Sequence, residues 1–327
     1  MASDIPYREE LSEGTVDELV KRPVGNYASL LVLRELKSHA IFTTTGEDAD
    51  ISTLSLNGVE YNPGLMFKRK QTGSDRRKGK EIQRRLLDID CTMDVNEMCQ
   101  KCVEDVLYGS AAAAEGLSIT SRVMYDSGFS IRDSAAIIEE KFQSAPGDEY
   151  MEEQGRESGP REPDFYIPGT LFPTTITLRD ATPEELAFVI AITMKNKRYG
   201  AVTSRIGRMK NHILGLYIGS EEGPANLELS QKIVLSLAEK VMTKDKDISI
   251  EDGIQEVLYS PSIDVSEVKE LSREIYKDQV DSLSINEFDQ EQLEEIIDWL
   301  KKDENLKEVL EDQHERSEKF VESLLSE

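Results

Sequence analysis

The sequence contains little of what catalytic sites usually require. Among its 327 residues there are only three histidines and one tryptophan, and aromatic residues make up 6%. With histidines only at His39, His212 and His314, a catalytic triad or a histidine metal cluster has few candidate residues. Neither a P-loop nor a G-x-S-x-G motif is present. The conventional catalytic patterns are therefore missing.

Long apolar runs and a disulfide framework are also missing. The longest apolar stretch, about Leu186–Met194, is far too short to span a membrane. The first residues are charged and lack the apolar region of a secretory signal. The cysteines Cys91, Cys99 and Cys102 form an odd, clustered set, which argues against a secreted disulfide framework. We therefore expect a cytoplasmic protein with no membrane partner.

Charge is abundant but unevenly distributed. The formal net charge of −25 disfavours nucleic acid as a partner, because like charges repel. However, residues 244–327 hold 26 acidic and 10 basic residues, and they account for most of that excess. Residues 65–85 have nine bases and two acids, and residues 195–210 have six bases and no acid. Two basic segments can therefore bind phosphate locally.

Hydrophobic patterning predicts a mixture of strands and helices. Residues 26–44, 122–131 and 211–219 have strand character, while 64–71 form a short apolar lead into a basic loop, and a short helix is expected at 80–88. Thr182, Pro183 and Glu185 form an N-cap, a first-turn proline and a capping-box glutamate, so we expect a buried helix over 186–194. A further helix is indicated by Leu229, Ile233, Leu237 and Val241.

The remaining segments define the expected domain organisation. Residues 144–169 hold four prolines, four glycines and seven acids, which is typical of a long mobile loop. Beyond residue 244, apolar residues at helical spacing predict amphipathic helices with acidic outer faces. We therefore expect an α+β domain over 1–243 and an acidic helical C-terminal region over 244–327 that packs on a neighbouring surface rather than on RNA.

The cysteine segment is the strongest candidate for a metal site. Cys91, Cys99, Cys102 and Asp105 place three thiols and a carboxylate within 15 residues. Zinc takes four such ligands, and a filled shell makes the site structural and not catalytic. The alternative is three reduced, buried cysteines that act as small hydrophobic residues. The polar stretch between Cys91 and Cys99 favours zinc.

The basic segments are candidates for phosphate binding. In the first, Lys68, Arg69 and Lys70 precede six further bases, and a solvated surface loop is the alternative. In the second, arginine and lysine side chains alternate with glycines, which allow close approach, and with a tyrosine that offers a stacking face. Its candidate RNA contacts are Arg198, Tyr199, Arg205, Arg208 and Lys210. His212 contacts RNA or is a hydrogen-bonded structural histidine.

Five segments together resemble one family. They are LMFKRKQT (65–72), CQKCVEDVLYG (99–109), RVMYDSGFSI (122–131), LFPTTITLRDAT (171–182) and KRYGAVTSRIGRMKNHILG (197–215). In this order they resemble the Csc-two family, the Cas-seven-type backbone subunits of type I-D CRISPR Cascade complexes. The resemblance covers roughly residues 25–245.

The resemblance implies a fold and a set of partners. It implies an RNA-recognition-like, ferredoxin-type core with finger and thumb insertions, and copies that polymerise along one CRISPR RNA guide with other Cascade subunits. Pairing with the guide then selects the target DNA, so the protein need only hold the guide by its backbone. Family members typically have a fourth cysteine where this chain has Asp105, and aspartate is an acceptable zinc ligand.

Two other classes of function are the alternatives. One is a metal-dependent nuclease subunit that cuts single-stranded target nucleic acid, for which Asp126 and the acids of 144–169 are the only candidate ligands of Mg²⁺. For Asp126, a turn-capping role is favoured over metal binding. The other is a metal-binding scaffold that contacts no nucleic acid, which leaves the bases of 195–210 unexplained. We expect a non-enzymatic RNA-binding subunit.

Overall fold

A central antiparallel sheet organises the chain in a computed structural model that describes residues 4–94, 97–111, 117–142, 161–200, 206–244 and 247–326. Its strands follow the order β12-β13-β1-β11-β7, and β14 pairs with the far end of β13. The bounds are β1 (Tyr27–Leu36), β7 (Val123–Tyr125), β11 (Leu171–Arg179), β12 (Arg198–Tyr199), β13 (Gly207–Gly219) and β14 (Ile285–Glu287).

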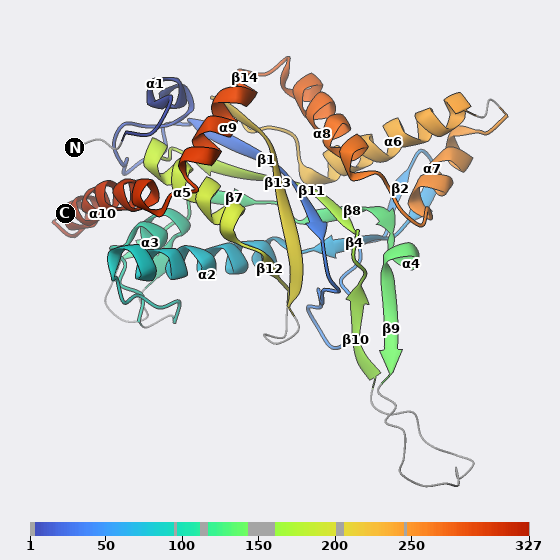
Figure 1. The fold of residues 1–327 in the computed structure, drawn as a ribbon, viewed down its shortest axis with the longest axis horizontal. Helices are drawn as coiled ribbons and strands as arrows, with labels where there is room; N and C mark the ends of the chain where they lie inside the picture. The colour runs from blue at the N-terminus through green and yellow to red at the C-terminus, as the bar shows by residue number, and fades with distance from the viewer. Residues whose placement is uncertain are drawn as a thin grey trace, which may run out of the picture.

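The centre of the sheet is buried on both faces because helices cover each of them (Figure 1). On β1, Leu30 and Val32 belong to one hydrophobic cluster, and Leu31 and Leu33 to another. Burial on both faces explains why the sequence of β1 is a nearly continuous apolar run. The first cluster includes side chains of α3 (Val103–Tyr108), α5 (Pro183–Lys195), α9 (Gln290–Trp299) and α10 (Asp303–Leu325). The second includes side chains of α6 (Asn226–Lys244), α7 (Ile250–Leu258) and α8 (Val265–Val280).

Helix α5 confirms the prediction made from its N-cap. The Thr182 hydroxyl accepts a hydrogen bond from the Glu185 amide at 3.2 Å, and the Glu185 carboxylate accepts one from the Thr182 amide at 3.0 Å. Pro183 occupies the first helical position. The cap satisfies amides at the start of the helix and so fixes where it begins, and every residue from Pro183 to Thr193 is buried.

The basic segment after residue 67 differs from the prediction. Instead of a loop and a short helix at 80–88, α2 (Lys68–Leu87) is one helix of 20 residues. Its buried face carries Gln71, Ser74, Asp75 and Lys80, which are polar. The hydrophobic periodicity of the sequence therefore could not indicate this helix, since hydrogen bonds and ion pairs fix the face that apolar contacts usually fix.

Two other expected boundaries also change. The strand expected over 26–44 ends at Leu36, and Ala40 makes only an isolated bridge to Tyr166. Within the loop expected over 144–169, Arg161–Tyr166 form β10, which pairs with β9 (Ile138–Phe142), and residues 143–160 lie outside the described residues. The buried ring of Tyr166 packs against Phe42 and Phe172, which fixes β10 to the body, and the hairpin projects from there (Figure 1).

The acidic C-terminal region packs on this chain's own sheet. β14 extends the sheet beside β13, and Leu293, Ile296, Leu306 and Leu310 belong to the same hydrophobic cluster as Leu30. The predicted amphipathic helices are confirmed as α8, α9 and α10. The apolar faces of these helices cover the sheet. The composition changes at residue 244, but the residues after it pack in the same hydrophobic clusters as the residues before it.

Shorter elements complete the fold. They are α1 (Arg8–Leu11), the 3₁₀ turn Ser12–Gly14, β2 (Leu54–Leu56), β3 (Val59–Tyr61), β4 (Pro63–Met66), β5 (Ser110–Ala111), β6 (Ser118–Ile119), β8 (Gly128–Asp133) and α4 (Ser134–Ile137). The strand predicted at 122–131 is thus two strands, β7 and β8, and the one predicted at 211–219 lies within β13. None of the helices in the described part of the chain has the length and apolar character that a membrane crossing demands.

Candidate metal centre and nucleic-acid interface

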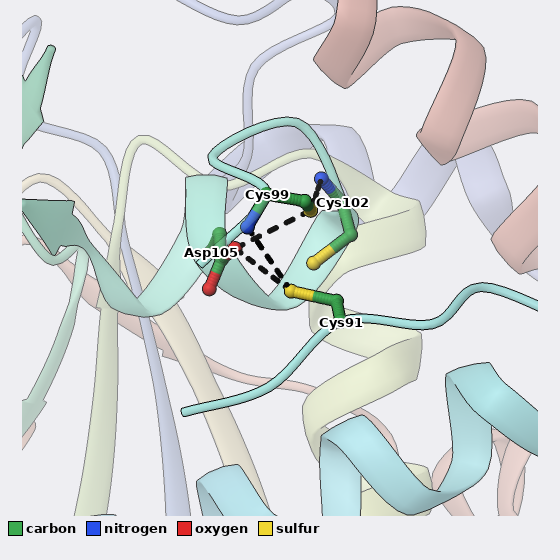
Figure 2. A group of neighbouring side chains, drawn as sticks. All are labelled: Cys91, Cys99, Cys102 and Asp105. Carbon is green, nitrogen blue, oxygen red and sulfur yellow. Dashed lines mark hydrogen bonds between the residues drawn. The ribbon is translucent and has the colours of Figure 1, made fainter. Parts of the chain in front are cut away.

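The four predicted metal ligands meet at one point beside helix α2 (Figure 2). Their ligand atoms all lie within 4.8 Å of one another. The Cys91 thiol donates to the Asp105 carboxylate at 3.2 Å, and the Cys99 thiol donates to the same oxygen at 3.4 Å. Backbone amides of Cys99 and Cys102 donate to the Cys91 and Cys99 sulfurs. Such amides stabilise thiolates, so the loop is built for anionic sulfur.

A buried lysine from α2 joins this cluster. Lys80 is 1% exposed, and its ammonium lies 2.8 Å from Cys91 Sγ, 3.3 Å from Cys102 Sγ and 2.6 Å from Asp105 Oδ1. It also lies 2.9 Å from a carboxylate oxygen of Glu104. Burial lowers the pKa of Lys80, but Glu104 and the Cys102 sulfur raise it by more, so the side chain carries its charge. Sequence reasoning missed Lys80 because it lies in a basic run.

Contacts among the thiols of the cluster shift the pKa values of Cys91 and Cys102 in opposite directions. Hydrogen bonds from Cys102 and Cys99, and one from Lys80, lower the pKa of Cys91. The hydrogen bond to Cys91 in turn raises the pKa of Cys102. These contacts favour the anionic form of the Cys91 sulfur over that of Cys102. Three cysteines and an aspartate in contact are a donor set that fits a tetrahedral divalent metal, and the cluster can hold a metal ion.

The second basic segment forms one exposed row of cations. β12 pairs with β13 so that Arg198 lies directly opposite Arg208, and Lys210 follows on the same face because side chains alternate along a strand. All three residues are exposed. None of the three forms an ion pair within the described residues. Arg205, a predicted contact, lies outside the described residues.

Tyr199 points to the opposite face and is buried. Its ring is 0% exposed, with the Arg34 guanidinium 4.9 Å from the ring centre. Its hydroxyl donates to Asp75 at 2.5 Å and accepts a hydrogen bond from Asn211 at 3.0 Å. The ring therefore has no open face for a base, and the stacking role predicted from the sequence is wrong in this structure. Tyr199 is a packing residue.

A buried polar network lies behind the exposed row. Asp75 of α2 accepts hydrogen bonds from Tyr199 and Asn196, and from Tyr125 at 3.0 Å. Its carboxylate lies 3.5 Å from Arg34, and both side chains are fully buried. Arg34 also donates to Asn211 at 3.0 Å. The network joins α2, β1, β12 and β13, and the sequence offered no signal for it beyond an arginine inside an apolar strand.

The first basic residues of α2 lie near the second basic segment. Arg69 donates to the Thr44 hydroxyl, and Lys70 donates to the Thr43 carbonyl. Gly200 approaches the same loop so closely that a Cβ there would lie 2.8 Å from the Ile41 carbonyl oxygen, and its φ of +121° also favours glycine. Residues 41–44 thus lie between the two basic segments. Lys68 and Arg69 are exposed there, whereas Lys70 is half-buried.

His212 lies at the edge of the row and is hydrogen-bonded. Its Nε2 is 2.9 Å from the Glu35 carboxylate, and its side chain is 9% exposed. Burial lowers the pKa of His212, opposed by the hydrogen bond to Glu35. The structure therefore agrees with the hydrogen-bonded alternative at this position, while leaving the ring at the border of the exposed face.

The acidic residues considered for a nuclease do not converge where the structure describes them. Asp126 is exposed, and its backbone carbonyl accepts hydrogen bonds from Gln71 and Asn226. Asp164 instead accepts from the Ala49 amide. Across the described residues, the cysteine cluster is the one group of three or more ligand residues that can hold a metal.

Comparisons with known proteins give a family and a fold. The family model described as Csc2 Crispr matches residues 14–310. The crystal structure of Thermofilum pendens Csc2 is similar with a TM-score of 0.60 at 15% identity, covering 92% of this chain and 91% of that chain. No curated protein matches the sequence.

Two chains of solved CRISPR complexes are more distantly similar. A chain of a type IV-B CRISPR complex has a TM-score of 0.37 at 13% identity, covering 57% of this chain and 90% of that chain. A chain of a CRISPR RNA-guided surveillance complex has a TM-score of 0.38 at 11% identity, covering 76% of this chain and 100% of that chain. The fold similarity therefore rests on the crystal structure.

Proposed function

This chain belongs to the Csc2 CRISPR family, and from that premise we propose that it is a backbone subunit of a type I-D Cascade-like complex that holds the CRISPR RNA guide. The family predicted from the sequence motifs is confirmed, over a longer part of the chain than those motifs cover. The proposed partners are the guide, target DNA paired to it, further copies of this chain and other Cascade subunits, in the cytoplasm.

The exposed row of Arg198, Arg208 and Lys210 is the observation that carries the proposal. In a chain with 64 acidic residues, three neighbouring exposed cations have no acidic partner among the described residues. Cations that no carboxylate neutralises attract an external anion, and same-face residues of a strand lie about 7 Å apart, so the row can follow a phosphate backbone.

The start of α2 supports the same proposal. Lys68, Arg69 and Lys70 occupy its first turn, and no acid lies in that turn. The Ser127 hydroxyl accepts a hydrogen bond from the Lys68 amide at 3.3 Å, and Lys70 lies 3.9 Å from the Asp50 carboxylate. Lys68 and Arg69 have no ion pair among the described residues, and the partial positive charge of a helix N-terminus makes cations there unfavourable unless an anion binds nearby. A phosphate held between this turn and the exposed row would satisfy both.

The strand order supports the ferredoxin-type core. Along the chain the elements run β1, α2, β7, β11, α5, β13, and in the sheet these strands lie in the order β13-β1-β11-β7 with every neighbour antiparallel. A β-α-β-β-α-β sequence is the motif of ferredoxin-like folds. We therefore regard the remaining helices and the β9–β10 hairpin as insertions in this core.

Zinc is the metal that we propose for the cysteine cluster. Soft thiolates select zinc among the common divalent ions, and four protein ligands leave no open position, so the role is structural. Cys91, Cys99, Cys102 and Asp105 would hold it and fix the loop before α3. Elemental analysis should give about one zinc per chain, and Cys102→Ser should lose most of it, whereas the exposed control Asp94→Asn should keep it.

Binding isotherms at several salt concentrations test the RNA role. For single strands the slope of log affinity against log salt is about −0.7 per phosphate contact. Replacing Arg198, Arg208 and Lys210 by alanine should therefore flatten the slope by about 2 for an oligouridine strand. The matched control replaces three exposed, ion-paired lysines of the C-terminal region, Lys301, Lys307 and Lys319.

Equal slopes for the folded triple variant and the wild type would show that the row is only a solvated surface. RNA length should also set the size of the assembly, because copies polymerise along one strand in the proposed role. Mass photometry with two strand lengths measures this. A single chain per RNA at every length would contradict the backbone role while leaving RNA binding intact.

A further inference from the structure

Helix α8 places two cations against the face of the sheet that carries the exposed row. The Arg273 Nε donates to the Leu214 carbonyl of β13 at 2.9 Å, which fixes the helix across that strand. Lys269 lies four residues earlier and therefore on the same side of the helix. Both side chains are half-buried. The helix thus turns a basic side toward β13, although it belongs to the acidic region after residue 244.

In the described part of the chain, the cations around this helix lie near one carboxylate, that of Glu35. Glu35 of β1 lies opposite Lys210 in the strand register, and it already accepts hydrogen bonds from Lys37 and His212. Among the described residues, Lys210 and Lys269 have no ion pair. One acid therefore faces a cluster of cations, defined here as the α8 cluster: Lys37, Lys210, Lys269 and Arg273.

The α8 cluster has the electrostatic signature of mutual repulsion. Burial lowers the pKa of Lys269, and Lys210 and Arg273 lower it further, while Glu35 raises it. After burial, Lys269 and Lys210 also act to lower the pKa of the neighbouring His212. Positive charges that destabilise one another are stabilised by an added anion, so the fold holds these side chains ready for one.

We propose that the α8 cluster is a phosphate subsite of the guide-binding face, and that Lys269 and Arg273 contact the RNA backbone there. This inference rests on the proposed function. It extends the row of Arg198, Arg208 and Lys210 onto a helix from the acidic region, which the sequence led us to expect away from RNA.

The position of the cluster favours a phosphodiester over the carboxylate of an acidic protein. Arg273 uses its Nε on Leu214, and within the described residues its two terminal nitrogens have no hydrogen bond, so they can bind two oxygens of an anion. Lys210 is common to the row and to the cluster, so a strand that follows the row meets the cluster at Lys210. The cluster is therefore the next contact for the same strand, and not a separate site for an acidic protein.

A single substitution tests this subsite. Lys269→Ala should flatten the salt slope for an oligouridine strand by about 0.7. Lys277→Ala is the control on the same helix, because Lys277 is exposed and ion-paired with Glu287 at 2.8 Å, and it should leave the slope unchanged. A Lys269→Ala slope equal to that of the control would overturn the inference.

Lysine footprinting on the unmodified chain gives an independent measurement. Bound oligouridine should protect Lys269 and Lys210 from acetylation and leave Lys277 reactive. Protection of Lys210 without Lys269 would overturn the inference and leave the proposed function standing. If neither the triple variant of the row nor Lys269→Ala changed the salt slope, the proposed function itself would be contradicted.

Discussion

The two basic segments of this chain are alike in sequence and different in structure. In α2, Arg76 contacts Glu104, Arg85 contacts Asp303, and Lys80 lies among the cysteines and Asp105. Along β12 and β13, Arg198, Arg208 and Lys210 have no such partners in the described part of the chain. Most of the α2 cations therefore hold the protein together, while those of the row face outward.

The difference shows that a run of basic residues becomes informative only when its internal partners are counted. A helix offers its side chains to several neighbouring elements, so cations on α2 meet acids from α3 and α10. A strand near the edge of a sheet has one covered face and one open face, so alternate residues stay exposed. Five substitutions, at Asp75, Arg34, Lys80, Tyr199 and Arg85, test whether this division between the segments is correct.

The largest effect should come from Asp75, which ties α2 to the second segment. Asp75→Ala leaves the buried guanidinium of Arg34 without its carboxylate, and removing one partner of a buried pair costs about 3–5 kcal/mol in the free energy of unfolding. Urea unfolding measures this loss. Exposed Asp126→Ala should change stability by less than about 0.5 kcal/mol.

A second substitution in this network separates charge from packing. Adding Arg34→Met to Asp75→Ala should recover part of the lost stability, because no unpaired guanidinium then remains buried. A single-variant loss under about 1 kcal/mol would mean that the network is not what joins α2 to β12 and β13.

The next effect concerns the cation inside the metal centre. Lys80→Met removes the charge that stabilises the cysteine thiolates, and loss of such an outer contact lowers metal affinity by about 10–100-fold. Competition with a chromogenic chelator measures zinc affinity, with Lys78→Met as the control because Lys78 pairs with Glu81 on the surface. Tighter zinc binding by Lys80→Met would show that the ammonium competes with the metal for its donors.

Tyr199→Phe should affect stability and not RNA binding. The substitution leaves Asp75 and Asn211 with one partner fewer in a buried site, which costs about 1–3 kcal/mol. The salt slope of RNA binding should stay at its wild-type value. Tyr259→Phe is an exposed control for the loss of a hydroxyl. If folded Tyr199→Phe lost RNA affinity while its stability was unchanged, Tyr199 would have to contact the RNA.

The smallest effect should come from the exposed pair of Arg85 and Asp303. A hydrogen bond from Arg85 lowers the pKa of Asp303 to about 2 from its usual 3.8. Because the pKa of Asp303 is lowered on folding, the pair adds stability at pH values above the usual pKa of 3.8. This added stability is lost as the pH falls toward 2. Arg85→Ala should cost under about 1 kcal/mol at neutral pH because solvent screens the pair.

The difference from wild type should shrink as the medium is acidified through this range. Unfolding curves at a series of pH values measure it, and Lys301→Ala, which removes a pair within the surface of the C-terminal region, is the control. A difference that grows on acidification would assign the effect of Arg85 to a group other than Asp303.

Much of the architecture follows from the sequence where apolar residues and caps determine it. The strands at 122–131 and 211–219, helix α5 and the C-terminal helices all follow from apolar spacing or from the cap at Thr182. Helix α2 does not, because its buried face is polar and becomes stable only when Glu104, Asp105 and Arg34 arrive from elsewhere in the chain.

The cysteine cluster was predictable from the sequence, and the role of Tyr199 was not. Cys91, Cys99 and Cys102 are close in sequence, so their spacing is enough to indicate a common site. Tyr199 differs because its surroundings come from distant strands and from α2. Alternation along β12 does carry one usable signal, since it places Tyr199 and Arg198 on opposite faces, so the two cannot serve the same strand of RNA.

That alternation also makes the hairpin sensitive to slippage. If β12 moved by one residue against β13, every side chain on it would change faces, so Arg198 would turn inward and Tyr199 outward. The hydrogen bonds from Tyr199 to Asp75 and from Asn211 to Tyr199 exist in a single alignment of the two strands. Tyr199 thereby holds the two strands in this alignment from the buried side, which keeps Arg198 and Arg208 exposed.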